Sequence, residues 1–294
     1  MVTYTIKDME VLTGVKTHTI RIWEKRYGII KPNRTDGNHR YYSEKNLRRL
    51  LNVCFLYKKG YKISKIAKLS DREVKDIITD HKAIDLSDKD MIDTLMIFVL
   101  DFDTYHFNKI LSEYMTQIGM TRTMNELIYP LMDRLNMAAI SGSVRKVHNS
   151  YFIEQLISKL HTEISTIESQ SSDSLHCMLY LPKRSTQELH IHYLNYLLQS
   201  NSYNVTNLGY EVSIDEVIIA HSSIQPDYVI TVMHESMSRR DREQYIREIA
   251  VAIRPSTLLI TGYQTEDLVE EEIENVFVFK KVEEVLNIIG IKKS

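Results

Sequence analysis

The sequence predicts a multidomain protein with three parts: an α-rich winged helix-turn-helix over residues 1–75, a four-helix bundle over residues 84–168, and a doubly wound parallel α/β sheet over residues 175–294. The first part shows two short helical segments around a glycine turn, followed by a basic, aromatic hairpin. The second part repeats apolar residues at helical spacing, and the third alternates strand-like and helix-like segments. A chain of 294 residues is long enough for two or three such domains.

The overall composition is that of a soluble protein. Apolar residues make up 43% of the chain, an ordinary share for a globular fold. No apolar run reaches the roughly 18 residues that a membrane helix needs, and the first residues lack the apolar core of a signal peptide. We therefore expect a cytoplasmic protein with no membrane contact. Cys54 and Cys177 stand in no metal-ligand spacing, so we expect two buried small hydrophobes and no metal site.

Charge is distributed unevenly along the chain. The formal net charge is only −2, but residues 1–75 hold 18 Lys and Arg against 7 Asp and Glu, a balance of +11. The remaining residues carry a balance of −13. A basic end on an acidic body indicates one polyanion-binding module attached to a part that does not bind polyanions.

The first two helices of the basic end are separated by a tight turn. The apolar spacing predicts a short amphipathic helix over Ile6–Leu12, and Gly14 supplies the turn. Thr17 is expected to cap the second helix with its side chain. Ile20 and Trp23 share one face of that second helix, which predicts that both are core residues.

The opposite face of the second helix and the hairpin after it are short, polar or basic, as contact with base edges and phosphates requires. The arginines alone are also compatible with solvated surface charges, and the tyrosines are expected to divide between packing the wing and touching DNA. The predicted DNA-contacting residues are Thr17, His18, Thr19, Arg21, Lys25, Arg26, Tyr27, Arg34, Asn38, His39, Arg40, Tyr41 and Tyr42.

A third helix follows the hairpin, with Ser43 as its cap, the span 44–59 as its body and Gly60 at its end. The nearly unbroken segment from Ile20 to Ser43 resembles the MerR family of bacterial transcription regulators. That resemblance implies promoter DNA as the partner and a homodimer or tetramer as the binding form. The thiol-dependent metal sensors of the family carry cysteines near a dimerisation helix, and this chain has none there.

The central part is predicted to be helical throughout. Its apolar residues recur at helical spacing, with interruptions near 101–104, 119–121 and 141–143 that divide it into about four helices. A polar stretch over 168–174 is read as a linker. The apolar positions are Leu95, Phe98, Val99, Phe102, Phe107, Ile110, Leu111, Tyr114, Leu127, Leu131 and Leu135.

The last part alternates strands and helices, which predicts a parallel sheet with ligands at the carboxyl ends of its strands. The predicted strands are His176–Leu181, Tyr203–Leu208, Tyr228–Val232, Thr257–Thr261 and Val276–Val278. The predicted helices are Glu188–Ser200, Ile214–Ser222, Arg239–Ile253, Glu266–Glu274 and Val282–Ile289.

The segment Leu197–Gly209 resembles the helix–strand segment of cobalamin-binding Rossmann-like domains. A MerR-like head, a helical bundle and such a sheet together resemble the CarA/CarH/LitR type of light- and B12-responsive regulators of carotenoid genes. The resemblance implies repression by covering a promoter, relieved by a signal. Activation by twisting a long promoter spacer, as in other MerR-like proteins, stays open.

The sheet part departs from that family at the lower face of the cofactor. The family's acid-x-His-x-x-Gly motif, counted back from Gly209, falls on Ser185, Gln187 and His190. Glutamine is a poor cobalt ligand beside imidazole, and His190 would stand where glycine lets the corrin approach. Glu188 and His190 form an acid-x-His three residues late, which leaves His190 open as a ligand, although a surface or capping role is commoner for a histidine at a helix start.

Two further positions of the family depart in the same direction. The Ser-x-Leu motif falls on Val232–His234 without its serine, and the Gly-Gly motif is half kept at Gly262. In the bundle, the family's Trp and Glu-His over the upper face of the cofactor fall on Met137, Val147 and His148. Only His148 survives, and a satisfied bundle histidine is the commoner role for such a residue.

The leading hypothesis is a sequence-specific transcription regulator, not an enzyme, whose sensor-like domain has lost the family's cobalamin binding. That domain would then bind a regulatory protein or a small ligand, or serve in oligomerisation. A second hypothesis keeps cobalamin as the cofactor, bound through His190 or with no lower histidine, in a light or B12 sensor that also uses His148, Gln187, Gly209 and Gly262. A third, a B12-dependent enzyme or methyl carrier, lacks any candidate catalytic domain after residue 75.

Overall fold

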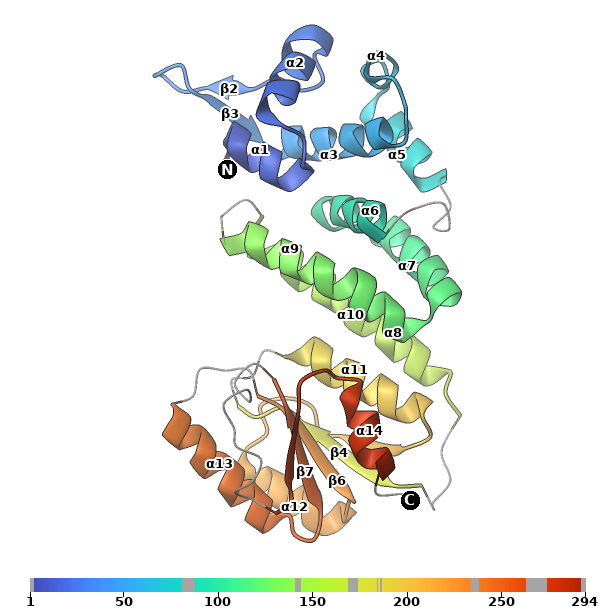
Figure 1. Cartoon of the computed structure of the whole chain (residues 1–294), viewed down its shortest axis with the longest axis vertical. Helices are drawn as coiled ribbons and strands as arrows, with labels where there is room; N and C mark the ends of the chain where they lie inside the picture. Colours follow the sequence, from blue (N-terminus) through green and yellow to red (C-terminus); the bar gives the residue numbers. More distant parts are fainter. Residues whose placement is uncertain are drawn as a thin grey trace. The chain divides into compact units, whose positions relative to one another are not determined.

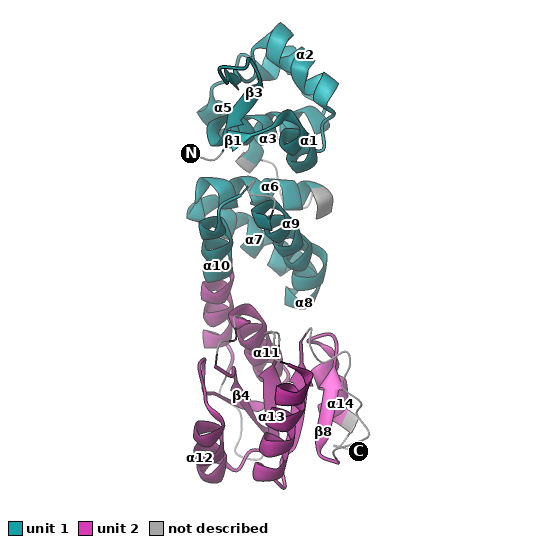
Figure 2. Ribbon diagram, turned by 90° about the vertical axis from the view of Figure 1, so that its left-hand side faces the viewer, with its two compact units in different colours: residues 1–155 teal, residues 156–294 magenta. Residues whose placement is uncertain are grey.

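The computed structural model describes residues 3–80, 88–140, 144–168, 174–183, 185, 187–233, 238–262 and 274–291. The chain divides into two compact units, residues 1–155 and 156–294 (Figure 2). The division falls inside one long helix, α10 (Lys146–Ser165). The three domain ranges expected from the sequence stay a prediction.

The first unit begins with the expected winged helix-turn-helix (Figure 1). Its wing is a small antiparallel sheet in the order β1-β3-β2, in which Tyr4 pairs with Tyr42 and Arg34 pairs with Arg40. The elements are β1 (Thr3–Tyr4), α1 (Ile6–Thr13), α2 (Thr17–Tyr27), β2 (Asn33–Arg34), β3 (Arg40–Ser43), α3 (Glu44–Lys58), α4 (Ile63–Ile66) and α5 (Asp71–Asp80).

Helix α1 starts at a capping box and ends at a glycine. The Thr5 side chain accepts from the backbone N–H of Asp8, and the Asp8 carboxylate accepts from the N–H of Thr5. Gly14 closes the helix with a φ of 70°, a left-handed conformation that glycine adopts without steric cost.

The expectation that Thr17 caps α2 is wrong. Lys16 is the N-cap residue, and it makes no side-chain capping bond. The Thr17 N–H donates instead to the Glu10 carboxylate of α1 at 3.1 Å. A carboxylate at a helix N-terminus satisfies a free backbone donor and favours the positive end of the helix dipole. A side chain of the neighbouring helix α1 therefore caps α2 in place of the Thr17 side chain.

Helix α3 follows the prediction closely. Ser43 caps it in a capping box with Asn46, and Lys58 is its last residue. Gly60 follows in a left-handed conformation, with a φ of 86°. The apolar face of α3, including Leu47 and Leu50, is buried, and the helix packs against α6 of the bundle.

Four helical stretches follow, as the sequence predicts from residue 88 onward; residues 84–87 lie outside the described ranges. The third stretch is continuous but changes pitch, because a π turn, η2, separates α8 from α9. Such a turn inserts one extra residue into a helix and often occurs at functional sites. The bounds are α6 (Asp88–Asp101), α7 (Thr104–Ile118), α8 (Met120–Thr123), η2 (Met124–Ile128), α9 (Tyr129–Ile140) and α10 (Lys146–Ser165).

The second unit contains the expected parallel sheet, with strand order β5-β4-β6-β7-β8. The order reverses between β4 and β6, and this is the point at which doubly wound sheets bind ligands beyond the carboxyl ends of their strands. The strands are β4 (His176–Tyr180), β5 (Asn204–Asn207), β6 (Tyr228–Val232), β7 (Thr257–Thr261) and β8 (Val276–Phe279).

Helices lie on both faces of this sheet (Figure 1). On one face, α12 and α13 share a core with the strands, in which Val217 and Ile249 pack with Met178 and Leu258. On the other face lie α11 and α14, and Tyr193 of α11 donates to Glu283, next to the start of α14. The helices are α11 (Glu188–Ser200), α12 (Ile214–Ile224), α13 (Arg239–Ala252) and α14 (Glu284–Ile291). The helix expected over 266–274 lies outside the described residues.

Among the helices that the structure describes, none combines the length and the apolar character needed to cross a membrane.

Candidate DNA-binding surface and the edge of the parallel sheet

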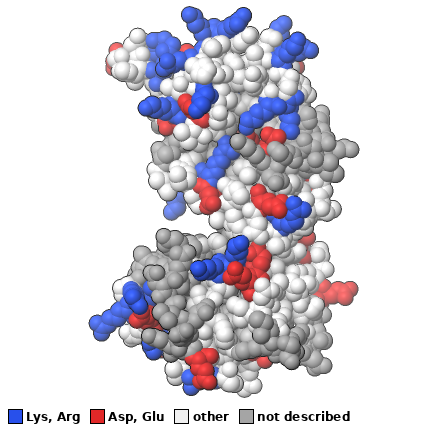
Figure 3. All heavy atoms as spheres, viewed as in Figure 1, with Lys and Arg blue, Asp and Glu red and all other residues white. Residues whose placement is uncertain are grey.

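Helix α2 presents a polar, basic face to solvent. Ile20 and Trp23 are buried beneath it, at 0% and 4% exposure. His18, Arg21, Lys25 and Arg26 are exposed, whereas Thr17 and Thr19 are half-buried at the start of the helix. Lys and Arg side chains gather over the helix-turn-helix part in the space-filling view (Figure 3). The structure thus brings the predicted helix residues to one accessible surface.

The wing contributes a second group of polar side chains. Arg34, Asn38, His39 and Arg40 are all exposed. The hairpin turn is held by the Thr35 N–H, which donates to the His39 carbonyl at 3.0 Å, and by the Asn38 N–H, which donates to the Thr35 carbonyl at 2.8 Å. Asn38 has a φ of 63°, and its side-chain oxygen accepts from Arg34 at 2.5 Å. These bonds fix the shape of the wing tip.

Glu24 joins the wing to α2. One carboxylate oxygen accepts from Arg40 Nε at 3.2 Å, and the other accepts from the Tyr42 hydroxyl at 3.1 Å. Tyr42 is fully buried, and burial together with the Glu24 charge raises its pKa to about 12. Tyr42 was expected among the DNA contacts, but its burial beneath the wing removes it from that surface.

The two remaining tyrosines are half-buried. The Arg26 guanidinium lies over the Tyr27 ring at 5.7 Å from its centroid, so Tyr27 supports a basic side chain of the exposed face. Tyr41 is on the strand face opposite Arg40 and Tyr42, because side chains alternate along a strand. Both side chains therefore stay partly accessible.

The sequence interpretation missed a group of lysines beside α2. Helix α4 packs against α2, and Lys62, Lys65 and Lys68 are exposed on and next to α4. Their three-residue spacing directly after Gly60 was the signal available in the sequence, because residues three apart share one side of a helix. They extend the basic surface beyond the helix and wing.

Part of the positive charge of residues 1–75 is neutralised inside the first unit. Lys59 Nζ lies 3.1 Å from Asp90, and Arg48 lies 3.2 Å from Asp101; both aspartates belong to α6. Further basic groups, Lys58 and Lys75, pair with Asp93, Asp101 and Asp103. The formal balance of +11 therefore overstates the charge that is free to meet DNA.

In the second unit, the predicted cofactor residues sit around the carboxyl end of β4. Gln187 is the N-cap residue of α11, and its backbone carbonyl accepts from the His190 and Ile191 N–H groups at 3.1 and 3.2 Å. His190 is half-buried in the first turn of α11. Ser185 is buried, with no hydrogen-bond partner for its Oγ among the described residues.

The two glycines of this edge have different surroundings. Gly209 has a φ of 82°, and a Cβ added there would meet no described atom within 4 Å. Gly262 has a φ of 126°, and a Cβ there would lie 2.1 Å from the Met233 carbonyl oxygen. Gly262 is thus required by the packing of the chain itself. His234, the last residue at the position of the Ser-x-Leu motif, lies outside the described residues.

His148 lies in the first unit, at the junction between the bundle and α3. Its ring stacks on Phe102 with centroids 4.7 Å apart, and its Nε2 lies 3.5 Å from Glu44 Oε1. Burial lowers its pKa, although Glu44 opposes that shift. Met137 and Val147, which the resemblance places at the family's Trp and Glu, are exposed at 69% and 52%. His148 thus packs beside α3 with its Nδ1 bonded to the Arg145 carbonyl at 3.2 Å, while its buried Nε2 has no hydrogen-bond partner among the described residues.

These residues do not reproduce the imidazole and carboxylate pair that the cobalamin motif would supply. Gln187, which the resemblance places at the ligand position, is the N-cap residue of α11, and its backbone carbonyl accepts two hydrogen bonds from the first turn of that helix. No group of three His, Cys, Asp or Glu side chains in the described part of the chain is placed to hold a metal ion. A buried histidine nearby, His192, has both ring nitrogens engaged by His161 and Tyr210.

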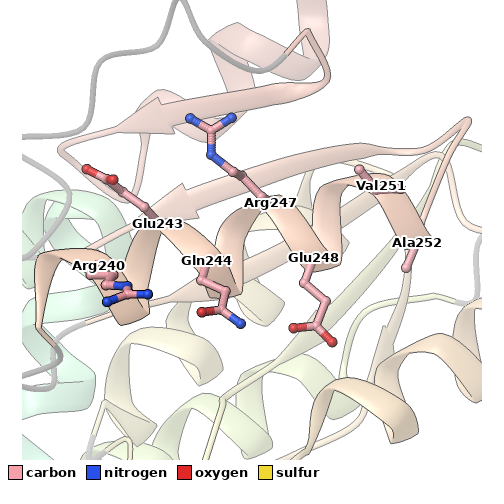
Figure 4. Close-up of a pocket in the computed structure, with 7 residues that line it drawn as sticks. All are labelled: Arg240, Glu243, Gln244, Arg247, Glu248, Val251 and Ala252. Carbon is pink, nitrogen blue, oxygen red and sulfur yellow. The ribbon is translucent and has the colours of Figure 1, made fainter.

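A shallow hollow also lies on the outer face of α13 (Figure 4). A single helix supplies its whole lining, and oppositely charged side chains alternate along it, as on a solvated helix surface. The lining residues are Arg240, Glu243, Gln244, Arg247, Glu248, Val251 and Ala252.

The helix-turn-helix, its wing and the exposed basic face define a MerR-type DNA-binding domain. The model of the MerR HTH family of regulatory proteins matches residues 4–73. The HTH-type transcriptional regulator MlrA of Escherichia coli is 34% identical over 77 residues, which are 26% of this chain and 32% of that protein. The chain thus spans about a third of the length of this relative.

A second relative is similar over most of the chain. The HTH-type transcriptional repressor CarH of Myxococcus xanthus is 22% identical over 262 residues, with 85% of each protein covered. The fold is also similar to a solved structure, the monomethylamine corrinoid protein of Methanosarcina barkeri, with a TM-score of 0.54 and 12% identity. That likeness covers 69% of this chain and 98% of the corrinoid protein, and it shows a shared fold of helices and parallel sheet.

Proposed function

We propose that the chain is a sequence-specific DNA-binding regulator of transcription that represses its promoters. The observation that carries this proposal is the accessible basic face of α2 beside the wing, within a MerR-type domain. Exposed arginines and lysines meet phosphates, while short polar residues at the start of α2 meet base edges. Similarity to a protein named as a repressor over 85% of the chain supports the sign of regulation.

Titration of a fluorescent mixed-sequence duplex with the full chain tests DNA binding. We expect the logarithm of the binding constant to fall linearly with the logarithm of the salt concentration, because phosphate contacts release counterions. Selection from a random duplex library should then recover a near-palindromic site, since a symmetric dimer reads two half-sites. Absence of binding at low salt, or binding with no salt dependence, would contradict the proposal.

The proposed binding form is a homodimer or tetramer on promoter DNA. A single α2 reads only a few base pairs, so two copies are needed for a specific site of useful length. Light scattering of the full chain, alone and with the selected site, measures the number of copies. A monomer in both conditions would contradict this part of the proposal while leaving DNA binding itself open to the titration.

For the second unit, we propose that the sensor-like domain has lost the family's mode of cobalamin binding and responds to a small ligand or a regulatory protein. Gln187 at the position of the lower ligand supports this, as does a Gly262 explained by internal packing. We also propose that the chain has no catalytic role. The alternative is a cobalamin-responsive regulator that uses His190 or no lower histidine, favoured by the similarity to CarH and to the fold of a corrinoid protein.

Visible spectra separate these two proposals. The purified chain is mixed with adenosylcobalamin or methylcobalamin, desalted, and compared with an unmixed sample. No retained corrin supports the loss of binding, whereas one corrin per chain supports the alternative. If corrin is retained, His190→Ala decides the ligand: a changed spectrum or lost retention assigns His190, and no change assigns binding without a lower histidine.

A further inference from the structure

Arg134 of α9 connects the helical bundle to the first helix of the DNA-binding domain. Its Nη1 donates to Asp93 Oδ1 of α6 at 2.5 Å, and its Nη2 donates to the backbone carbonyl of Leu12 in α1. The Arg134 side chain is only 26% exposed. One guanidinium therefore reaches two acceptors, one in the bundle and one in the helix-turn-helix.

Asp93 pairs with a basic side chain on each side of this junction. It is 8% exposed, and it accepts from Lys58 of α3 as well as from Arg134. A carboxylate that is so nearly buried needs partners of this kind, because removing one leaves a poorly solvated charge. Four helices, α1, α3, α6 and α9, thus meet at Arg134 and Asp93.

The contact with Leu12 lies at the end of α1 that interacts favourably with a cation. Leu12 lies in the last turn of α1, where backbone carbonyls have no partner within the helix and the dipole is negative. A guanidinium can donate to this carbonyl and to a carboxylate at the same time, because its N–H groups form a planar fork. A lysine ammonium has no such fixed geometry.

Helix α1 passes this restraint on to α2. Glu10, one turn before Gly14, accepts from the Thr17 N–H at the start of α2. A series of hydrogen bonds therefore connects Arg134, the end of α1, Glu10 and the N-terminus of α2. The helix that carries Arg134 also follows directly on the π turn η2. A change of this turn to α-helical pitch would displace α9 by about one residue, or about 1.5 Å, along its axis.

We propose that Arg134 is a positioning residue for DNA binding: its clamp on Leu12 and Asp93 makes the placement of α9 determine the orientation of α2. This proposal rests on the proposed function, because it gives Arg134 an effect on how well the MerR-type domain binds DNA. The hydrogen bonds of Arg134 in the described part of the chain go to α1 and α6 and not to α2. Its effect on DNA is therefore indirect.

The test compares three variants in the full chain. Arg134→Lys keeps the charge and loses the planar fork of donors. Arg134→Met removes the charge and the donors but keeps an unbranched stem. Lys109→Ala removes an exposed cation of α7 as a control. Binding to a mixed-sequence duplex is measured over a range of salt. We expect affinity to fall by about fivefold or more in both Arg134 variants, the usual size of a coupling between sites. The salt slope should stay that of the wild type, and the control should match the wild type throughout.

Hydrogen exchange without DNA supplies a second readout. The amides of Gly14 and Thr17, which bond to the Glu10 carbonyl and carboxylate, should exchange faster in both Arg134 variants and at the wild-type rate in Lys109→Ala. Far-UV circular dichroism checks that each variant is folded. If a variant is unfolded, the milder Arg134→Lys carries the test.

Each outcome decides the proposal. Lower affinity with faster exchange and an unchanged salt slope supports it. Unchanged affinity, unchanged exchange, or a slope reduced by about one charge overturns it, since the last result means a direct phosphate contact. If the wild-type chain binds no duplex at all, the proposed function fails, and the exchange measurement still decides whether Arg134 restrains α1 and α2.

Discussion

The Glu10 carboxylate of α1 accepts a hydrogen bond from the Thr17 backbone N–H at the start of α2, at 3.1 Å. The same carboxylate pairs with Lys16 at 3.0 Å, which leads the interactions that lower the pKa of Glu10, followed by the Thr17 N–H. One residue of the first helix thus completes the N-terminus of the second. The turn at Gly14 is short enough to bring these two ends together.

Substitution of Glu10 by Gln should weaken the helix-turn-helix. The neutral amide accepts a weaker hydrogen bond than the carboxylate and adds no charge to favour the helix dipole. We expect a lower urea midpoint, followed by the fluorescence of Trp23, which is the single tryptophan and lies in α2. A folded-state pKa below the ordinary 4.5 means that the contribution is present above pH 4.5 and is lost as pH falls through the folded pKa. An equal midpoint for the two proteins at neutral pH would contradict the capping role.

Tyr42→Phe should destabilise the same domain without touching its surface. The substitution removes one hydrogen bond to Glu24, while Arg40 keeps its own bond to the other carboxylate oxygen. A bond to a charged acceptor contributes about 1.5–3 kcal/mol. Trp23 fluorescence in urea measures the loss. Tyr41→Phe, the same chemical change at a half-buried neighbour, is the matched control and should cost far less. Equal losses would show that the Tyr42 hydroxyl contributes nothing specific.

Most of the fold could be predicted because its signals are local. A glycine at residue 14 predicts the turn, and Ser43 predicts the start of α3. Each strand and helix of the sheet domain likewise shows its own apolar pattern within a short segment. The burial of Tyr42 had no such local signal. Side chains alternate along a strand, so Arg40 and Tyr42 share a face and both contact Glu24, yet Arg40 is exposed and Tyr42 is buried.

The rest depended on contacts between residues far apart in the sequence. Glu10 replaces Thr17 as the cap because α1 and α2 pack together, which no capping rule for a single helix can show. His148 faces Glu44 because α10 meets α3. The count of charges in residues 1–75 could not reveal that α6 neutralises several of them. These are properties of the packed fold.

Arg40 and His18 should affect DNA binding in different ways. Arg40→Ala should weaken binding to every duplex and reduce the salt slope by about one, as the loss of one phosphate contact requires. His18→Ala should change which sequences a random library yields, because His18 is exposed near the start of α2, where side chains reach base edges. Arg240→Ala, on α13 of the second unit, is the control for arginine removal. The distinction is lost if Arg40→Ala alters the selected sequence and His18→Ala does not.

The two glycines at the sheet edge should differ in their tolerance of alanine. Gly262→Ala places a Cβ 2.1 Å from a backbone oxygen at a φ of 126°, so the chain must shift, and we expect a loss above about 3 kcal/mol. Gly209→Ala meets only the cost of a left-handed backbone, about 1–2 kcal/mol. Far-UV circular dichroism in urea measures both, because Trp23 reports on the other unit. Similar losses of stability in the two variants would mean that the Met233 backbone moves at little cost, and that packing does not require glycine at residue 262.

The second unit should lose stability in mild acid through His192. Burial, followed by the nearby charge of His161, lowers the pKa of His192 from 6.5 to about 4. Below pH 6.5 the unfolded chain therefore takes up a proton that the folded chain does not. The contribution of His192 is fully present above pH 6.5 and declines as pH falls toward about 4.

This decline can be isolated with His192→Gln, which keeps a donor and an acceptor toward His161 and Tyr210 but does not titrate. Urea midpoints by circular dichroism at about pH 7.5 and about pH 5 give the pH dependence of each protein. We expect the wild type to lose about 1–2 kcal/mol more than the variant, after allowance for solvent screening. Other histidines titrate in both proteins, so only the difference reports on His192. A variant with the same acid sensitivity as the wild type would show that His192 is protonated as readily in the folded chain as in the unfolded one.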